Sequence, residues 1–320
     1  MTKDNASQIA LPQRRSNRPV TLAHRFEFAV VVILMGLFRL LGVDRASAFS
    51  GYALRFLGPK LRSISKRGET NLRLIFPDWN ERQVRDTIST VWENLGRTAA
   101  EYAHLDQFTT QGEAARIQHR GVEKILHLKE DPGRAVFVTG HFANWEIAGI
   151  VAQELGLEFG FVYRALNNPL IDEMIIKKRG AVTTRRQIPK GVAGARPMID
   201  LLKDGLSIAF LADQKLNTGG ISVPFMGHKA MTAPAAARIA VRFNLPVVPI
   251  TTERADGARF NVEIHSPIDF TPTGDLLADV EALTIKINEA LEAQIRKRPG
   301  EWLWFHRRWP KETYARSGLD

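Results

Sequence analysis

His141 and Glu146 are the residues of this sequence whose types and spacing best fit proton-transfer chemistry. A histidine can act as a general base near neutral pH because its ordinary pKa is about 6.5. A carboxylate within reach of the other ring nitrogen would fix the tautomer and stabilise the imidazolium that forms when a proton is taken. The alternative is a histidine that only hydrogen-bonds a backbone carbonyl, since an H-x4-E pattern is short.

The sequence around this pair predicts a strand, a turn and a helix. Residues 136–138 are consecutive β-formers, which indicates a buried strand that stops at residues 139–140. A helical pattern follows from about Asn144, whose side chain could cap the first exposed N–H groups. A turn between a strand and a helix lies at the mouth of an α/β sheet, where such folds bind ligands. We therefore expect the active site at this turn.

Two more polar positions follow predicted strands and would share that mouth. Arg164 ends a predicted strand over 157–164, and Asp213 with Gln214 closes the apolar strand over 206–213. A strand-end arginine can bind a phosphate bidentately, or it can form a structural salt bridge. From the residues alone both interpretations of Arg164 stay open.

The order of the elements predicts the fold class. Further strands are expected at 245–252 and 259–265, and helices at 81–104, 168–178, 196–203, 234–244 and 275–297. Strands that alternate with helices predict an α/β fold with a mixed, largely parallel sheet covered by helices. Glu101, near the end of the first of these helices, has no evident role in the sequence.

The composition excludes several classes of enzyme. The chain has no cysteine, so it has no disulfide, no thiolate nucleophile and no cysteine-ligated zinc. It also lacks a G-x-S-x-G elbow, an H-E-x-x-H pair and a P-loop, which are the usual signatures of serine hydrolases, zincins and nucleotide hydrolases. No metal and no bound cofactor are implied.

Nearly all of the net charge of +10 lies near the N-terminus, where residues 1–67 hold twelve Lys and Arg against three Asp and Glu. This basic block surrounds an unbroken apolar run over 28–38, which is shorter than the ~20 residues that cross a bilayer. A helix that lies on an anionic membrane surface would account for both the basic block and the short apolar run. A plain core helix is the alternative. We expect a disordered basic arm over 1–22, a membrane-associating helical segment over 23–67 and one catalytic domain over 68–320.

The C-terminal segment WLWFHRRW, residues 302–309, interleaves aromatic and basic side chains. It could complete the core, form a belt at a membrane interface or stack on nucleic acid. Because no nucleic-acid-binding motif accompanies the aromatics, no nucleic-acid partner is expected.

Four segments of the sequence, taken in this order, are similar to those of a known protein family: AVFVTGHFANWEIAGI (135–150), Asp213-Gln214, VPFMG (223–227) and WLWFHRRW. Together they resemble the bacterial lipid A biosynthesis acyltransferases of the lauroyl and myristoyl type, within the lysophospholipid acyltransferase superfamily, over about residues 25–309. The resemblance implies an O-acyltransferase that moves a fatty acyl chain from acyl-carrier protein to a hydroxyl of a lipid A precursor by direct attack. It implies His141 as general base, Glu146 as the residue that orients it, and a location at the cytoplasmic face of the inner membrane.

The resemblance also implies substrate-binding residues. The family pattern of Tyr-Arg followed by Asn-Pro occurs at residues 163–164 and 168–169, which favours a functional Arg164. Arg179 matches the arginine after the next helix, and Asp213 and Gln214 are expected at the pocket. The glycines around VPFMG indicate a loop close to the ligand. An enzyme of this fold that acts on another glycolipid or phospholipid would share these motifs, and a non-catalytic membrane scaffold would tolerate loss of His141.

Overall fold

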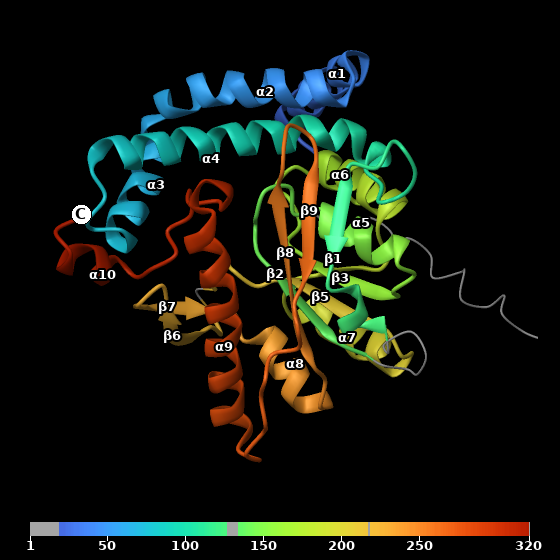
Figure 1. The fold of residues 1–320 in the computed structure, drawn as a ribbon, viewed down its shortest axis with the longest axis vertical. Coiled ribbons are helices and arrows are strands. Elements are labelled where there is room, and N and C mark those ends of the chain that lie inside the picture. Colours follow the sequence, from blue (N-terminus) through green and yellow to red (C-terminus); the bar gives the residue numbers. More distant parts are fainter. Residues whose placement is uncertain (1–18, 127–133, 217, 320) are drawn as a thin grey trace, which may run out of the picture.

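A seven-stranded sheet forms the centre of the computed structural model, which describes residues 19–126, 134–216 and 218–319 (Figure 1). The strand order is β1-β9-β8-β2-β5-β3-β4. The strands are β1 (Ile117–Arg120), β2 (Val136–Thr139), β3 (Phe159–Tyr163), β4 (Gln187–Pro189), β5 (Ser207–Leu211), β8 (Val247–Arg254) and β9 (Phe260–Ile264). All neighbouring strands pair in parallel except β8 and β9, which are antiparallel. The predicted α/β fold with a largely parallel sheet is confirmed.

Strand direction brings the ends of several strands to one edge of the sheet. Thr139 of β2 pairs with Leu211 of β5, and Tyr163 of β3 pairs with Pro189 of β4. Since these strands are parallel, the residues that follow each of them lie at the same edge. The polar positions that the sequence places after β2, β3 and β5 therefore meet there.

Helices cover both faces of the sheet because side chains alternate along each strand. Val136 and Val138 belong to the core on the side of α8 and α9, whereas Phe137 belongs to the core on the side of α5. The helices of this part are α5 (Ile147–Glu154), α6 (Pro169–Val182), α7 (Val192–Lys203), α8 (Ala235–Phe243), α9 (Leu276–Lys297) and α10 (Lys311–Arg316).

Helices from the N-terminal part lie along one end of the sheet (Figure 1). They are α1 (Leu22–Leu41), α2 (Val43–Leu57) and α4 (Glu81–Glu101), whereas α3 (Arg62–Ile75) lies beside α4 and α10, away from the sheet. Gly96 of α4 lets α2 approach closely, because a Cβ at this position would lie 2.4 Å from the carbonyl oxygen of Ser50. Asn168 caps α6 as predicted, and its Nδ2 donates to the carbonyl of His24 (2.9 Å), which connects α6 to α1.

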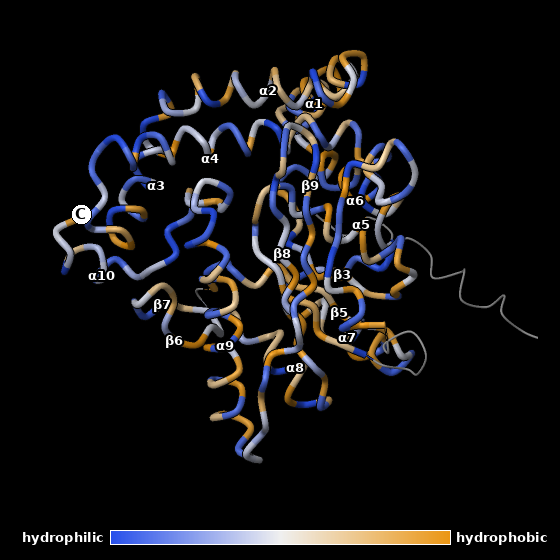
Figure 2. Tube along the Cα trace, viewed as in Figure 1, coloured by the Kyte–Doolittle hydropathy of each residue, from blue (hydrophilic) through white to orange (hydrophobic). Residues whose placement is uncertain are grey.

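The N-terminal segment is helical as expected, and α1 is not a core helix, since none of its residues is buried. Apolar residues recur along α1 and α2 (Figure 2). Within the described part of the chain, no helix is both long and apolar enough to cross a membrane. Most of the predicted basic arm, residues 1–18, lies outside the described residues.

Two local expectations are corrected. Asn144 does not cap a helix that starts beside it, because α5 begins only at Ile147. The VPFMG segment is not a loop: it forms the end of β6 (Ile221–Phe225) and the tight turn into β7 (His228–Thr232), with Met226 and Gly227 at positive φ. Of the alternatives for WLWFHRRW, the structure supports the core: Trp302, Trp304, Phe305 and Trp309 are buried.

Candidate active site

His141 follows β2 and lies against the residue that follows β5, its neighbour in the sheet. The Nδ1 atom of His141 is 2.8 Å from Oδ1 of Asp213, and its backbone N–H donates to Oδ2 of the same carboxylate (2.8 Å). An ionised carboxylate can only accept, so this contact places the proton of a neutral imidazole on Nδ1. The Nε2 atom is then the basic one.

Asp213 is buried, and every partner that it has stabilises its charge. The indole Nε1 of Trp302 donates to Oδ2 (2.8 Å), in addition to the contacts from His141. Burial by itself would raise the pKa of Asp213, but the charge of His141 and these hydrogen bonds lower it to about 2. The carboxylate therefore stays ionised and can stabilise an imidazolium at His141.

Two side chains flank the imidazole ring of His141. The Nε2 atom of Gln214 lies 3.3 Å from Nε2 of His141, and the ring of Trp145 meets the imidazole edge-on with centroids 5.0 Å apart. A contact of 3.3 Å is long for a hydrogen bond, so a substrate hydroxyl can replace the Gln214 amide at Nε2.

The expected partnership of His141 and Glu146 is wrong, because Asp213 occupies Nδ1. Glu146 instead accepts from Nε and NH2 of Arg179, at 2.7 and 2.6 Å, and from the hydroxyl of Tyr102. The physical reason is the late start of α5: Glu146 lies just before Ile147, where its carboxylate meets α6 rather than the strand end.

Burial alone would raise the pKa of Glu146, but the charge and hydrogen bonds of Arg179 keep it lowered. Burial and the charge of Glu146 both raise the pKa of Tyr102, so its phenol stays neutral and donates. Burial would lower the pKa of Arg179, yet Glu146 raises it, so the guanidinium stays charged. This cluster has a permanent ion pair at its centre and no group poised to exchange protons.

A cavity of about 1010 Å³ opens beside His141, at the upper limit of ordinary small-molecule pockets. Its walls are mostly apolar and come from α1, α4, α6 and α7, including Val31, Met35, Leu95, Ile171, Ile175 and Met198. Tyr102, Arg179 and Gln214 also line it. An apolar cavity with one basic imidazole can hold a hydrocarbon chain and place its polar end at Nε2.

Arg164 and Lys190 lie together at the cavity wall. The register of β3 and β4 makes them neighbours, and the backbone N–H of Lys190 donates to the carbonyl of Tyr163 (2.8 Å). Burial lowers the pKa of Lys190, and the charge of Arg164 lowers it further. No ion pair of either side chain occurs among the described residues, so the salt-bridge interpretation of Arg164 is not supported. No group of three His, Asp or Glu that could hold a metal occurs in the described ranges either.

The family of the chain is shown by comparison with known proteins. A family model for bacterial lipid A biosynthesis acyltransferases matches residues 16–311. The chain belongs to this family. It is therefore an acyltransferase, as the resemblance implied.

Curated relatives agree with the family match at low identity. A lipid A biosynthesis acyltransferase of Haemophilus influenzae is 23% identical over 255 residues, which cover 78% of this chain and 76% of the relative. The lipid A biosynthesis myristoyltransferase of Escherichia coli K12 is 23% identical over 258 residues, 78% of this chain and 76% of that enzyme. The lauroyltransferase of the same organism is 25% identical over 260 residues, 80% of this chain and 81% of that enzyme.

The structure brings together most of the residues that the sequence singled out, and adds several that it did not. His141, Arg164, Arg179 and Gln214 all line the cavity, and Asp213 contacts His141 directly. Sequence reasoning missed Tyr102, Trp145 and Lys190. A signal for Trp145 existed, since it lies within the H-x4-E motif; Lys190 follows a strand of only three residues, which carries almost no sequence pattern.

Proposed function

We propose that this chain transfers a fatty acyl group from the thioester of acyl-carrier protein to a hydroxyl of a lipid A precursor, at the cytoplasmic face of the inner membrane. The supporting observation is the His141–Asp213 pair at the wall of a large apolar cavity, in a chain of the lipid A acyltransferase family. The acyl-carrier donor and the lipid A acceptor are carried over from the names and chemistry of that family.

The proposed step is direct attack by the acceptor hydroxyl on the thioester carbonyl. The hydroxyl proton moves to Nε2 of His141 while the oxygen forms the new bond to the carbonyl carbon. The tetrahedral intermediate then collapses, the C–S bond breaks, and the leaving thiolate takes the proton from Nε2. Asp213 holds Nδ1–H throughout and stabilises the imidazolium.

Direct attack is supported by the side chains around the imidazole. The chain has no cysteine, and among the described residues the two ring nitrogens of His141 contact Asp213 and Gln214 rather than a hydroxyl. An acyl-enzyme needs a nucleophile within hydrogen-bond reach of its base.

We assign Arg164, together with Lys190, to anionic groups of the substrates or to the developing oxyanion. An arginine binds a phosphate through a two-point contact, and a lysine beside it adds a second positive charge. Arg179 has a different role in this proposal: Glu146 and Gln187 occupy its guanidinium, so it shapes the cavity wall and does not bind a charged substrate.

We also propose that α1 and α2 bind the protein to an anionic membrane surface. Large apolar side chains on these helices and just after them are more than half exposed: Leu22, Phe26, Ile33, Leu37, Leu40, Phe49, Tyr52, Phe56, Leu57 and Leu61. Because α1 also lines the cavity through Val31 and Met35, the membrane would lie close to the entrance for a lipid substrate. Basic residues from this segment add roughly 1 kcal/mol each near an anionic surface.

The test of the proposed function is the variant His141→Ala, assayed with purified protein, a panel of acyl-carrier thioesters and a lipid A precursor. We expect transfer to fall by about 10²–10⁴-fold, the usual contribution of a general base, while the melting temperature stays within a few degrees of wild type. Product masses report both the chain that is transferred and its acceptor. Near-wild-type transfer by the variant would remove the proposed base, and products made only on another glycolipid or phospholipid would replace the acceptor.

A further inference from the structure

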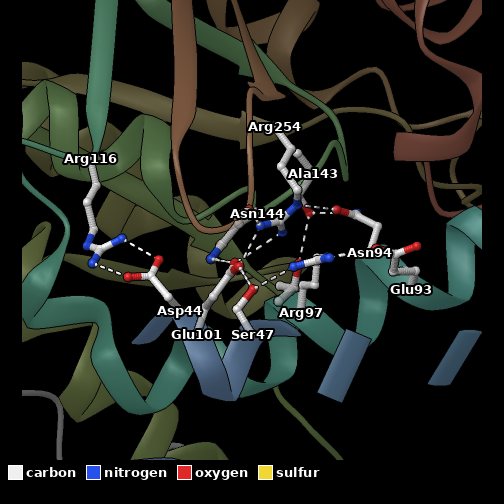
Figure 3. Close-up of polar contacts among 12 residues, drawn as sticks. Asp44, Ser47, Glu93, Asn94, Arg97, Glu101, Arg116, Ala143, Asn144 and Arg254 are labelled. Carbon is white, nitrogen blue, oxygen red and sulfur yellow. Dashed lines mark hydrogen bonds and ion pairs between the residues drawn. The ribbon is translucent and has the colours of Figure 1, made fainter. Parts of the chain in front are cut away.

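A buried polar network joins α4 to the turn after β2, and the chemistry above does not use it (Figure 3). Glu101, the last residue of α4, is fully buried, and its carboxylate accepts from the hydroxyl of Ser47 (2.7 Å) and from Nδ2 of Asn144 (2.9 Å). The guanidinium of Arg254 donates to both oxygens of the same carboxylate. Neither Glu101 nor Arg254 lines the cavity, so this ion pair lies outside the proposed substrate site.

The turn that this network contacts is residues 140–145, here named the His141 loop. Its Ala143 has a φ of +43°, a region that residues with a side chain rarely adopt. Such a conformation persists only where the surroundings hold it. The carbonyl of Ala143 accepts from Nδ2 of Asn94 and from Oγ1 of Thr98, both at 3.1 Å and both on α4.

The guanidinium of Arg254 links these contacts to Glu101. Besides pairing with Glu101, Arg254 donates from Nε to Oδ1 of Asn94 (3.1 Å), which orients the Asn94 amide toward Ala143. Asn144 accepts at its Oδ1 from the backbone N–H of Glu146 (3.2 Å) while it donates to Glu101. The loop is thus held at two successive residues, Ala143 and Asn144, which are two and three positions beyond His141.

We propose that Glu101 is a positioning residue for acyl transfer: through Asn144 it holds the His141 loop so that the imidazole stays against Asp213. This inference rests on the proposed role of His141 as general base. A displacement of about 1 Å in a reacting group can reduce a rate about 10²-fold. A loop that drifts should therefore lower kcat much more than it changes substrate binding, because most of the cavity wall comes from α1, α4, α6 and α7.

The central experiment exchanges the donor and the acceptor of the hydrogen bond between Asn144 and Glu101. In Glu101→Gln the amide oxygen keeps the contacts with Ser47 and NH1 of Arg254. The amide NH2 takes the place of Oε2, where it opposes two donors, Nδ2 of Asn144 and NH2 of Arg254. In the double variant Glu101→Gln with Asn144→Asp, the new amide at position 101 donates to the new carboxylate at position 144. The bond between positions 101 and 144 is restored in reverse and the net charge is unchanged, whereas NH2 of Arg254 still lacks its acceptor at position 101.

We expect Glu101→Gln to lower kcat by at least 10-fold with KM within about 2-fold of wild type. The exchanged double variant should regain kcat to within about 3-fold of wild type. A purely structural ion pair gives a different result, because the double variant still lacks the Glu101 charge opposite Arg254 and would be as impaired as the single one.

Glu93 offers the matched control, since it is another carboxylate of α4 in contact with two arginines. It accepts from Nε of Arg97 (2.9 Å) and NH1 of Arg55 (2.8 Å), and within the described ranges it has no hydrogen bond to the His141 loop. Glu93→Gln should lower the melting temperature and leave kcat unchanged. If Glu101→Gln does not fold, Asn144→Ala tests the same contact, because it leaves the ion pair of Glu101 with Arg254 in place and removes the donor from the His141 loop; a drop in kcat at constant KM is expected.

The outcomes separate this proposal from the function that it rests on. Wild-type kcat in Glu101→Gln, or in Asn144→Ala where Glu101→Gln does not fold, overturns the positioning role, as does a double variant no better than the single one. In either case His141→Ala remains inactive if the proposed function holds. If His141→Ala is active, the function itself fails, whatever Glu101 does.

Discussion

Two buried carboxylates lie beside the same cavity, and they differ mainly in the basic side chain that each one contacts. Asp213 is 2.8 Å from His141, and Glu146 is 2.6 Å from Arg179. The side chains of both carboxylates are 2% exposed. A guanidinium never releases its proton at physiological pH, whereas an imidazole exchanges one near neutrality. A short carboxylate–cation contact therefore indicates catalysis only where the cation can titrate and reach a substrate.

The largest effect expected from this comparison is the loss of activity in Asp213→Asn. An amide in place of the carboxylate no longer forces the proton onto Nδ1 or stabilises the imidazolium, so kcat/KM should fall by about 10²–10⁴-fold. Glu146→Gln, measured under conditions where it is folded, should lose far less. A near-wild-type Asp213→Asn would show that the imidazole does not depend on this carboxylate, and equal losses in the two variants would show that activity depends on Glu146 as much as on Asp213.

The sequence located the candidate site but paired the histidine with the wrong carboxylate. Both His141 and Asp213 were found because each follows a short run of β-formers, and runs of that kind end at the mouth of a parallel sheet. That β2 lies next to β5, across 72 positions of sequence, is a fact of topology that no local pattern contains. Nearness in sequence favours Glu146 as the partner of His141, but α5 begins only at Ile147 and the Glu146 carboxylate meets Arg179 instead.

The elements that the sequence missed were short or depended on distant partners. Strand β4 has three residues, too few for a recognisable alternation, and the β6–β7 hairpin was interpreted as a loop because of its glycines. The helices with strong caps were predicted well: Asn168 and Asp275 each accept from backbone N–H groups of the helix that they precede. The role of Glu101 required Arg254, which lies 153 positions away.

The second prediction concerns the free energy of unfolding. Here the Glu146–Arg179 pair should matter more than the His141–Asp213 pair, the reverse of the order expected for activity. Glu146→Gln leaves the buried guanidinium of Arg179 without its counter-charge, which typically costs about 3–5 kcal/mol of unfolding free energy. The double variant Glu146→Gln with Arg179→Met removes both charges and should recover most of that loss. Chemical denaturation of the three proteins measures the effect. A single variant as stable as wild type would show that the ion pair is not buried in solution.

The third prediction follows from the pKa of Asp213, which is lowered from 3.8 to about 2. A carboxyl group whose pKa is lower in the folded protein adds stability that is present above the unfolded value and is lost as the pH falls through the folded one. The shift corresponds to roughly 2 kcal/mol. The difference in unfolding free energy between wild type and Asp213→Asn should therefore shrink by about this amount from pH 4 to pH 2. A difference that stays constant over this interval contradicts the lowered pKa.

The smallest effect is expected at Gln214, which contacts the same imidazole on its other nitrogen. At 3.3 Å its amide lies where the acceptor hydroxyl must bind, so the substrate displaces it and its loss changes little. Gln214→Ala should reduce kcat by only about 3–10-fold, in contrast to Asp213→Asn. A donor to the oxyanion would behave differently, since its removal costs about 10²–10³-fold in kcat. Steady-state kinetics of the two variants side by side therefore show whether only the carboxylate end of His141 is essential, or whether the amide end also stabilises the transition state.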